Sequence, residues 1–427
     1  MANIRQLKNG NYKITVSNGR DINGKQIREY TLWEPEPEKT KRQNEKALEL
    51  FALEFEKKVK KGAYLDGEKL KYADFITLWK RDYCETQMQV TTRERTYYEL
   101  DARILPAIGH LKMAQIKPLH IQQIYNNMQE NGYERNGTHY DYSTNSIKRT
   151  HQVLSSSFNT AVQWQLIDSN PCNRVKPPKA EKQVDVKHFT LEQAQTFLDY
   201  LTQPYAVTYR GHKKKDGSSS AERTEIHSVP LQFQLFFKMA LFGGFRRGEL
   251  TALTWNDIDF DKNSVNITKS TARTKDGMIN KTPKNFSSNR TVNMPADVMQ
   301  LLKRHKVEQS KYRLAVGSYW KGSDFIFTQD DGKQMDISTP NGLMRKIIRR
   351  YNASVSNEAD KLPLINVHGL RHTSATLLIA QNIDVKTVSN RLGHSETSTT
   401  MDIYAHALEK QDAIAAESLS NMFQKNA

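Results

Sequence analysis

Cysteine is scarce in this chain, and long apolar runs are absent from it. The 427 residues include only Cys84 and Cys172, so neither a disulfide framework nor a cysteine-based zinc site is expected. No stretch approaches the roughly 20 apolar residues of a membrane-spanning helix, and the first residues, MANIRQLKNG, contain no apolar signal core. We therefore expect a protein of the reducing cytoplasm that does not use a membrane.

Acidic residues are too few to balance the basic ones. The chain has 63 Lys and Arg against 47 Asp and Glu, a formal net charge of +16. Such a surplus favours a polyanionic partner, because each Lys or Arg placed on a phosphate releases condensed counterions. The charge alone leaves an anionic membrane as the competing partner of nucleic acid.

The sequence pattern predicts three domains. In the first, residues 1–65, two alternating segments separated by Asn-Gly turns precede a charged helical stretch, so we expect a small sheet plus one helix. This unit is either a capping hairpin or a small DNA-contacting arm module. The apolar side of the helix is predicted to consist of Ala47, Leu48, Leu50, Phe51, Leu53 and Phe55.

The second domain, residues 70–175, has the pattern of an all-α domain, with a helical break predicted at Ile104–Gly109. Its last helix, about 144–165, carries Lys148, Arg149 and His151, which could face DNA or form an ordinary solvated face. Asn170-Pro171 and the run 176–179 predict a linker, because prolines in series cannot continue a helix.

The third domain, residues 186–427, is predicted to be mainly α with a small antiparallel sheet, whose strands include 264–268 and 290–294. The basic insertion 210–223 is expected to be an exposed loop or a hairpin tip. An apolar helix ends at Gly243-Gly244, and the next helix opens with Arg246. Glu249 follows three residues later, on the same helical face.

Several further residues in this domain suit work on a phosphate. Lys284 lies in a basic stretch between the two strands, where Lys275 and Lys281 are alternatives. His368 and Arg371 are one helical turn apart and can point at one phosphate. The spacing of His368 and His372 also allows a zinc helix, but Gly369 stands where a metalloprotease helix has its Glu. The last candidates are His394 and Tyr404.

Together these residue types suit phosphoryl transfer from DNA without a metal or cofactor. Two guanidiniums can clamp non-bridging phosphate oxygens, and a tyrosine hydroxyl can attack phosphorus to form a covalent ester. The leaving oxygen needs a proton donor, and the nucleophile must lose its proton. A magnesium nuclease would need a cluster of carboxylates, which the sequence pattern does not offer.

The ordered set of motifs resembles the tyrosine recombinase (phage integrase) superfamily, most strongly over about Thr190–Leu408. Residues 70–172 resemble its helical core-binding domain, and the first 60 or so resemble the arm-binding domain of integrases of temperate phages and conjugative transposons. The motifs are Gly244-Phe245-Arg246-Arg247-Gly248-Glu249, Pro283-Lys284, His368-Gly369-Leu370-Arg371-His372, Leu392-Gly393-His394 and Tyr404.

The resemblance implies a role for each residue of the set. Arg246 and Arg371 would bind the scissile phosphate, and Lys284 would protonate the leaving 5′-oxygen. His368 would handle the tyrosine proton, His394 would hydrogen-bond the phosphate, and Tyr404 would form a 3′-phosphotyrosine. Glu249 is interpreted as structural support.

The resemblance also implies partners: double-stranded DNA with core and arm sites, a homotetramer on that DNA, an excisionase and a host DNA-bending protein. The helical tail Leu408–Phe423 would dock on a neighbouring subunit or pack on its own domain. Two other functions stay open, a catalytically silent DNA-binding regulator and a type IB topoisomerase. The intact residue set disfavours the first, and the arm-like domain disfavours the second.

Overall fold

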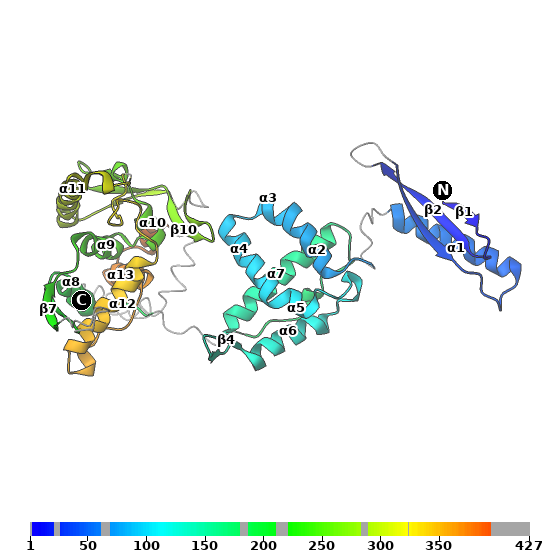
Figure 1. Ribbon diagram of the computed structural model, residues 1–427, viewed down its shortest axis with the longest axis horizontal. Helices are drawn as coiled ribbons and strands as arrows, with labels where there is room; N and C mark the ends of the chain where they lie inside the picture. The colour runs from blue at the N-terminus through cyan, green and yellow to red at the C-terminus, as the bar shows by residue number, and fades with distance from the viewer. Residues whose placement is uncertain are drawn as a thin grey trace, which may run out of the picture. The chain divides into compact units, whose positions relative to one another are not determined.

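A computed structural model describes most of the chain. The chain divides into two compact units, Met1–Lys182 and Gln183–Ala427 (Figure 1). Among the described helices, none is both long and apolar enough to cross a membrane. The described residues are 2–20, 26–60, 69–179, 187–210, 221–282, 289–322 and 324–393.

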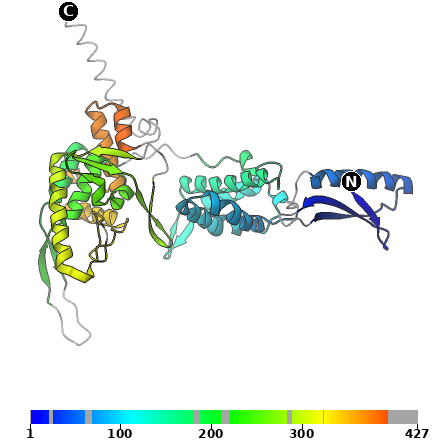
Figure 2. The same ribbon diagram turned by 90° about the horizontal axis from the view of Figure 1, so that it is seen from above.

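The first unit begins with the predicted sheet and helix. Strands β1 (Asn3–Gln6), β2 (Tyr12–Arg20) and β3 (Gln26–Trp33) pair antiparallel, and helix α1 (Lys41–Lys60) lies along one face of them (Figure 2). The prediction of the buried helix face was partly wrong. Leu50 and Leu53 are 58% and 56% exposed, whereas Leu48, Ala52 and Val59 are buried, because the sheet packs against only one face of a helix that has apolar residues on more than one side.

The helices that follow α1 in the first unit share one hydrophobic core. A π-helical turn and a short hairpin among them were not predicted from the sequence. The break expected at Ile104–Gly109 does not end the helix, since a π-helical turn, Leu100–Ile104, joins α4 to α5. Pro106 follows this π-helical turn as the second residue of α5. A short hairpin, β4–β5, separates α6 from α7. The elements are α2 (Tyr72–Trp79), α3 (Glu85–Gln87), α4 (Val90–Glu99), α5 (Leu105–Ile108), α6 (Pro118–Asn131), β4 (Tyr133–Arg135), β5 (Thr138–Tyr140) and α7 (Thr144–Gln163).

Asn170-Pro171 was wrongly predicted to belong to a linker. Pro171–Arg174 forms a 3₁₀ turn whose Cys172 is buried in the helical core. The Asn170 side chain caps this turn by accepting from the Cys172 backbone N–H at 2.8 Å, and it donates to Asn159 Oδ1 at 2.8 Å. The stretch 176–179, which contains two prolines, follows this turn.

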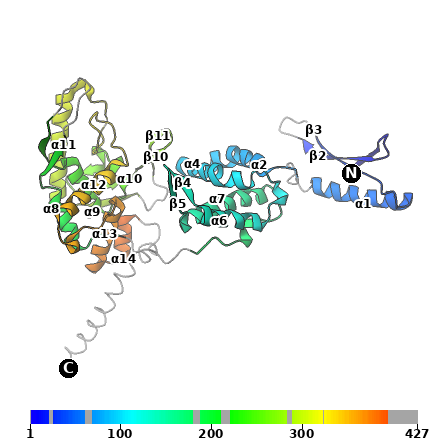
Figure 3. The same ribbon diagram turned by 60° about the horizontal axis from the view of Figure 1, so that its bottom comes forward.

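The second unit is built around α9 (Leu231–Gly243), which is apolar on nearly every side and is therefore buried. Its Leu235, Phe236 and Phe237 are fully buried, and it contacts both α11 and α13 (Figures 1 and 3). The helices around it are α8 (Leu191–Tyr200), α10 (Arg247–Ala252), α11 (Ala296–Val316), α12 (Thr339–Ser354), α13 (Val367–Ala380) and α14 (Val385–Leu392).

The predicted small sheet is confirmed, with strand order β12-β9-β8. A second hairpin, β10–β11, lies between β9 and β12 in the sequence and was not predicted. The insertion is flanked by β6 and β7, which pair antiparallel, while its centre, 211–220, lies outside the described residues. The strands are β6 (Tyr205–Tyr209), β7 (Arg223–His227), β8 (Ile258–Asp259), β9 (Ser264–Ile267), β10 (Ser270–Thr274), β11 (Gly277–Lys281) and β12 (Arg290–Asn293).

Candidate active site

Arg246 lies at the N-terminal cap of α10, directly after the turn that ends α9. Gly244 makes this turn with φ +62°, a left-handed conformation that favours glycine. A Cβ atom at Gly244 would also come within 2.5 Å of Leu392 Cδ2 on α14. The glycine therefore lets α10 start where it does, and that start fixes the backbone of Arg246.

Glu249 lies in the first turn of α10 and accepts hydrogen bonds from Arg246. Its carboxylate accepts from the Arg246 backbone N–H at 2.9 Å and from Arg246 Nη1 at 2.8 Å. It also accepts from Arg290 Nη2 at 2.8 Å. Burial alone would raise the pKa of Glu249, but the bonds and charges of Arg290 and Arg246 outweigh it and lower that pKa. Glu249 is therefore a carboxylate that two guanidiniums share.

Arg371 reaches the same turn from α13. Its side chain is buried, 1% exposed, and its Nη1 donates to the Gly244 carbonyl at 2.8 Å. Arg371 is thus bound to the backbone two residues before Arg246. Helix α13 is fixed at its start by Asn366, whose side chain accepts from the Gly369 N–H at 3.1 Å. The two arginines predicted to share a phosphate therefore meet at one turn.

His368 lies in the first turn of α13 and is exposed. Desolvation of its ring by the surrounding protein and the positive charges of Arg371 and Arg246 lower the pKa of His368. The His372 ring stands perpendicular to it at 4.6 Å between centroids. Burial, together with His368 and Arg371, lowers the pKa of His372 to about 4. Both shifts favour the neutral imidazole, and a neutral His368 can accept a proton.

The C-terminal end of α14 is hydrogen-bonded to Arg246 and to the end of α9. Arg246 Nη2 donates to the Gly393 carbonyl at 2.8 Å. Arg391 Nη2 donates to the carbonyls of Phe242 at 2.9 Å and Asn293 at 3.0 Å. These bonds fix the point from which the segment carrying His394 continues. His394, Tyr404, Lys284 and the tail 408–423 lie outside the described residues.

The alternative lysines fall at opposite ends of the β10–β11 hairpin. Lys281 pairs with Ser270, whereas Lys275 lies in the turn at the tip. Helix α10 packs against the Ser270 end, since a Cβ at Gly248 would come within 2.6 Å of Ser270 Oγ. Lys281, and not Lys275, thus lies at the end of the hairpin next to α10.

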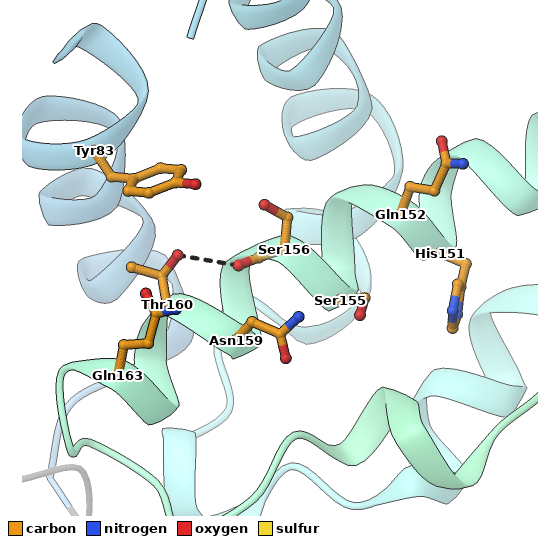
Figure 4. Close-up of a pocket in the computed structure, with 8 residues that line it drawn as sticks. All are labelled: Tyr83, His151, Gln152, Ser155, Ser156, Asn159, Thr160 and Gln163. Carbon is orange, nitrogen blue, oxygen red and sulfur yellow. Dashed lines mark hydrogen bonds between the residues drawn. The ribbon is translucent and has the colours of Figure 1, made fainter. Parts of the chain in front are cut away.

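A second candidate surface is a polar groove of about 440 Å³ along α7 (Figure 4). His151, one of the residues predicted to face DNA, lies in it and bonds to Tyr125 Oη at 2.6 Å, and burial lowers its pKa. Exposed amides come from Gln152, Asn159 and Gln163. Amide side chains can bond to the edges of bases. The lining is Tyr83, His151, Gln152, Ser155, Ser156, Asn159, Thr160 and Gln163.

Comparisons with known proteins point to one family. The Phage integrase family model matches residues 219–411, and the Phage integrase N-terminal SAM-like domain matches 71–129. The "Tyrosine recombinase XerC-like" protein of Caldanaerobacter subterraneus subsp. tengcongensis is 28% identical over 98% of both chains. The "ICEBs1 integrase" of Bacillus subtilis is 25% identical over 98% of this chain and 99% of its own.

A solved structure shares the fold. The Tn1549 transposon integrase, in complex with transposon right end DNA, superposes with a TM-score of 0.62 at 21% identity, covering 82% of this chain and all of that one, 100%. Fold and site thus define an enzyme that breaks and rejoins DNA. The chain belongs to the phage integrase family of tyrosine recombinases.

Arg290 is a site neighbour that the sequence did not reveal. The pattern assigned it only to a strand, which is correct, but nothing local distinguishes it from other basic residues of that stretch. Its partner Glu249 lies 41 residues away. The sequence signal is indirect: Glu249 was interpreted as structural support, and a supporting carboxylate can accept hydrogen bonds from a second cation.

Proposed function

We propose that this protein is the integrase of a mobile genetic element, which it inserts and excises through a 3′-phosphotyrosine at Tyr404. The observation that carries the proposal is the pair Arg246 and Arg371: Arg371 is bound to the Gly244 carbonyl, and Arg246 directly follows that turn and binds the Gly393 carbonyl. His368, whose pKa is lowered, lies close to both charges. Two cations next to a proton acceptor suit a phosphodiester in transit between two oxygens.

In the proposed reaction Arg246 and Arg371 hold the non-bridging oxygens, and Tyr404 attacks in line. The bond from the tyrosine oxygen to phosphorus forms as the bond to the 5′-oxygen breaks. His368 takes the tyrosine proton, Lys284 gives a proton to the 5′-oxygen, and His394 bonds to the phosphate. Attack by the 5′-hydroxyl of another strand reverses these steps and completes the exchange, without a metal or cofactor.

The proposed organisation assigns each domain its own DNA. Residues 1–65 would bind arm sites, 70–175 the core site, and 186–427 would cut. Four such chains would act together on two duplexes, helped by an excisionase and a host bending protein, in the cytoplasm. An element integrase is favoured because the ICEBs1 integrase of Bacillus subtilis aligns over 98% of this chain, the N-terminal domain included.

The groove on α7 is proposed to contact the bases of the core site. Thr160 is engaged within the fold: it donates to the Ser156 carbonyl at 3.1 Å (Figure 4), and it accepts from Trp79 Nε1 at 3.0 Å. Gln152, Asn159 and Gln163 are exposed and four or seven residues apart, hence on one helical face. An amide that pairs with adenine gives about 1–3 kcal/mol of discrimination.

Gln152→Ala and Gln163→Ala should each weaken binding to core-site DNA about 10-fold, the low end of that range, and leave binding to scrambled DNA unchanged. Fluorescence anisotropy with both duplexes measures this. Gln123→Ala, at an exposed position of α6 in the same domain, is the matched control. An equal loss on scrambled DNA would mean that these amides do not read sequence.

The function itself is tested by mapping cuts on a supercoiled plasmid that carries the joined ends of a candidate element. An integrase should cut only within one short inverted repeat and leave protein on the 3′ ends. Cuts spread over the whole plasmid would indicate a topoisomerase instead. Specific binding with no cut at all would indicate a regulator.

A further inference from the structure

Arg290 is a buried arginine that contacts α10, α14 and the turn between α9 and α10. Its side chain is 7% exposed, and its Nη2 and Nη1 donate to the two Glu249 oxygens on α10 at 2.8 and 3.1 Å. Its Nε donates to the Arg391 carbonyl at the end of α14 at 2.7 Å. The guanidinium carbon lies 5.8 Å from the centroid of the Phe245 ring. None of these side-chain contacts is needed for Arg290 to pair with β9 through its backbone.

The C-terminal end of α14 packs closely against Arg290. Gly393 has φ +69°, and a Cβ there would come within 2.9 Å of Arg290 Nη1. The Gly393 carbonyl accepts from Arg246 Nη2 at 2.8 Å. Arg246 and Arg290 therefore both donate hydrogen bonds to the Glu249 carboxylate and to backbone carbonyls of the 391–393 turn.

The charges of this group explain why two arginines are needed. One buried carboxylate between two guanidiniums leaves a single net positive charge, which is available to a phosphate. Without Arg290, Glu249 would be balanced by Arg246 alone, and this pair would carry no net charge. The carboxylate would then compete with the phosphate for the Arg246 guanidinium, at short range and away from bulk water.

We propose that Arg290 is a positioning residue for strand cleavage. It neutralises Glu249 so that the charge of Arg246 is free for the scissile phosphate, and it fixes the turn from which the segment bearing His394 and Tyr404 continues. The inference rests on the proposed function. It differs from a purely structural role, because it ties Arg290 to the charge on the phosphate.

The first test is single-turnover cleavage of a nicked attachment-site duplex at saturating protein. Arg290→Gln should cleave about 10- to 100-fold more slowly, as a displaced catalytic group does, with unchanged affinity for the duplex. Arg304→Gln is the control, since it removes an exposed arginine that pairs with Glu308 on α11 at 3.1 Å. Cleavage by Arg290→Gln at the wild-type rate overturns the proposal.

The second test uses a methylphosphonate in place of the scissile phosphate, which removes one charged oxygen. Arg246 then matters less, so the deficit of Arg290→Gln should shrink; an equal deficit on both substrates means a structural role and overturns the proposal. If Arg290→Gln does not fold, Arg290→Lys is tested in its place: Lys keeps the charge that neutralises Glu249 but not the guanidinium fork, so its cleavage should be slowed less than is expected of Arg290→Gln, and a loss as large as that expected of Arg290→Gln overturns the proposal. Failure of the wild type to form an adduct would instead refute the proposed function.

Discussion

Tyr404→Phe is expected to bind attachment-site DNA with wild-type affinity and to form no covalent protein–DNA adduct. The substitution removes one oxygen and leaves the aromatic ring, so packing around the residue should be preserved. The lost oxygen is the atom proposed to bond to phosphorus, and no other group on that side chain can replace it. The expected effect is complete loss of the adduct and not a reduction.

The assay is a nicked duplex from which the short 5′-hydroxyl fragment diffuses away, so that the adduct accumulates and is resolved on a denaturing gel. Tyr312→Phe is the control, because Tyr312 is an exposed tyrosine on α11 and should give the wild-type yield. An adduct formed by Tyr404→Phe would show that another residue is the nucleophile.

Arg371→Ala is expected to slow cleavage about 100- to 1,000-fold, the usual cost of losing one preorganised donor to a developing charge. Arg371 is nearly inaccessible to water and is oriented by the Gly244 carbonyl. A buried, oriented guanidinium interacts more strongly with a phosphate than an exposed one does. Arg371→Lys keeps the charge but loses the planar fork, so its cleavage rate should lie between those of the wild type and Arg371→Ala.

Single-turnover rates, with melting temperatures measured alongside, separate this effect from unfolding. The exposed Arg304, changed to Ala, controls for the loss of one positive charge from the same unit. A rate for Arg371→Ala within about threefold of wild type, a difference of under 1 kcal/mol, would remove Arg371 from the site.

Local periodicity was enough to predict most elements of the fold. The apolar run that forms α9, its glycine end and the strands β9 and β12 all follow from sequence spacing. Features that depend on distant contacts were not predictable. The buried face of α1 is chosen by the sheet against which it packs, and Pro171 is held in a packed turn by Asn170 and not in a linker. Tertiary packing overrode the local signal in both cases.

The candidate site divides in the same way. Arg246, His368 and Arg371 were identified by residue type and order, and the structure brings the two arginines to one turn with the histidine nearby. Arg290 was missed because its function is expressed only in contacts with Glu249 and Arg391, which are far away in the sequence. Motifs reveal groups that act on substrate, whereas their supporting partners emerge from the fold.

The most direct test of the account is to trap the covalent complex, digest it with protease and nuclease, and sequence the nucleotide-bearing peptide by mass spectrometry. The account predicts a peptide that contains Tyr404, joined through its phenolic oxygen to the 3′-phosphate of the cleaved strand. A nucleotide attached to any other residue, or joined through a 5′-phosphate, would contradict it.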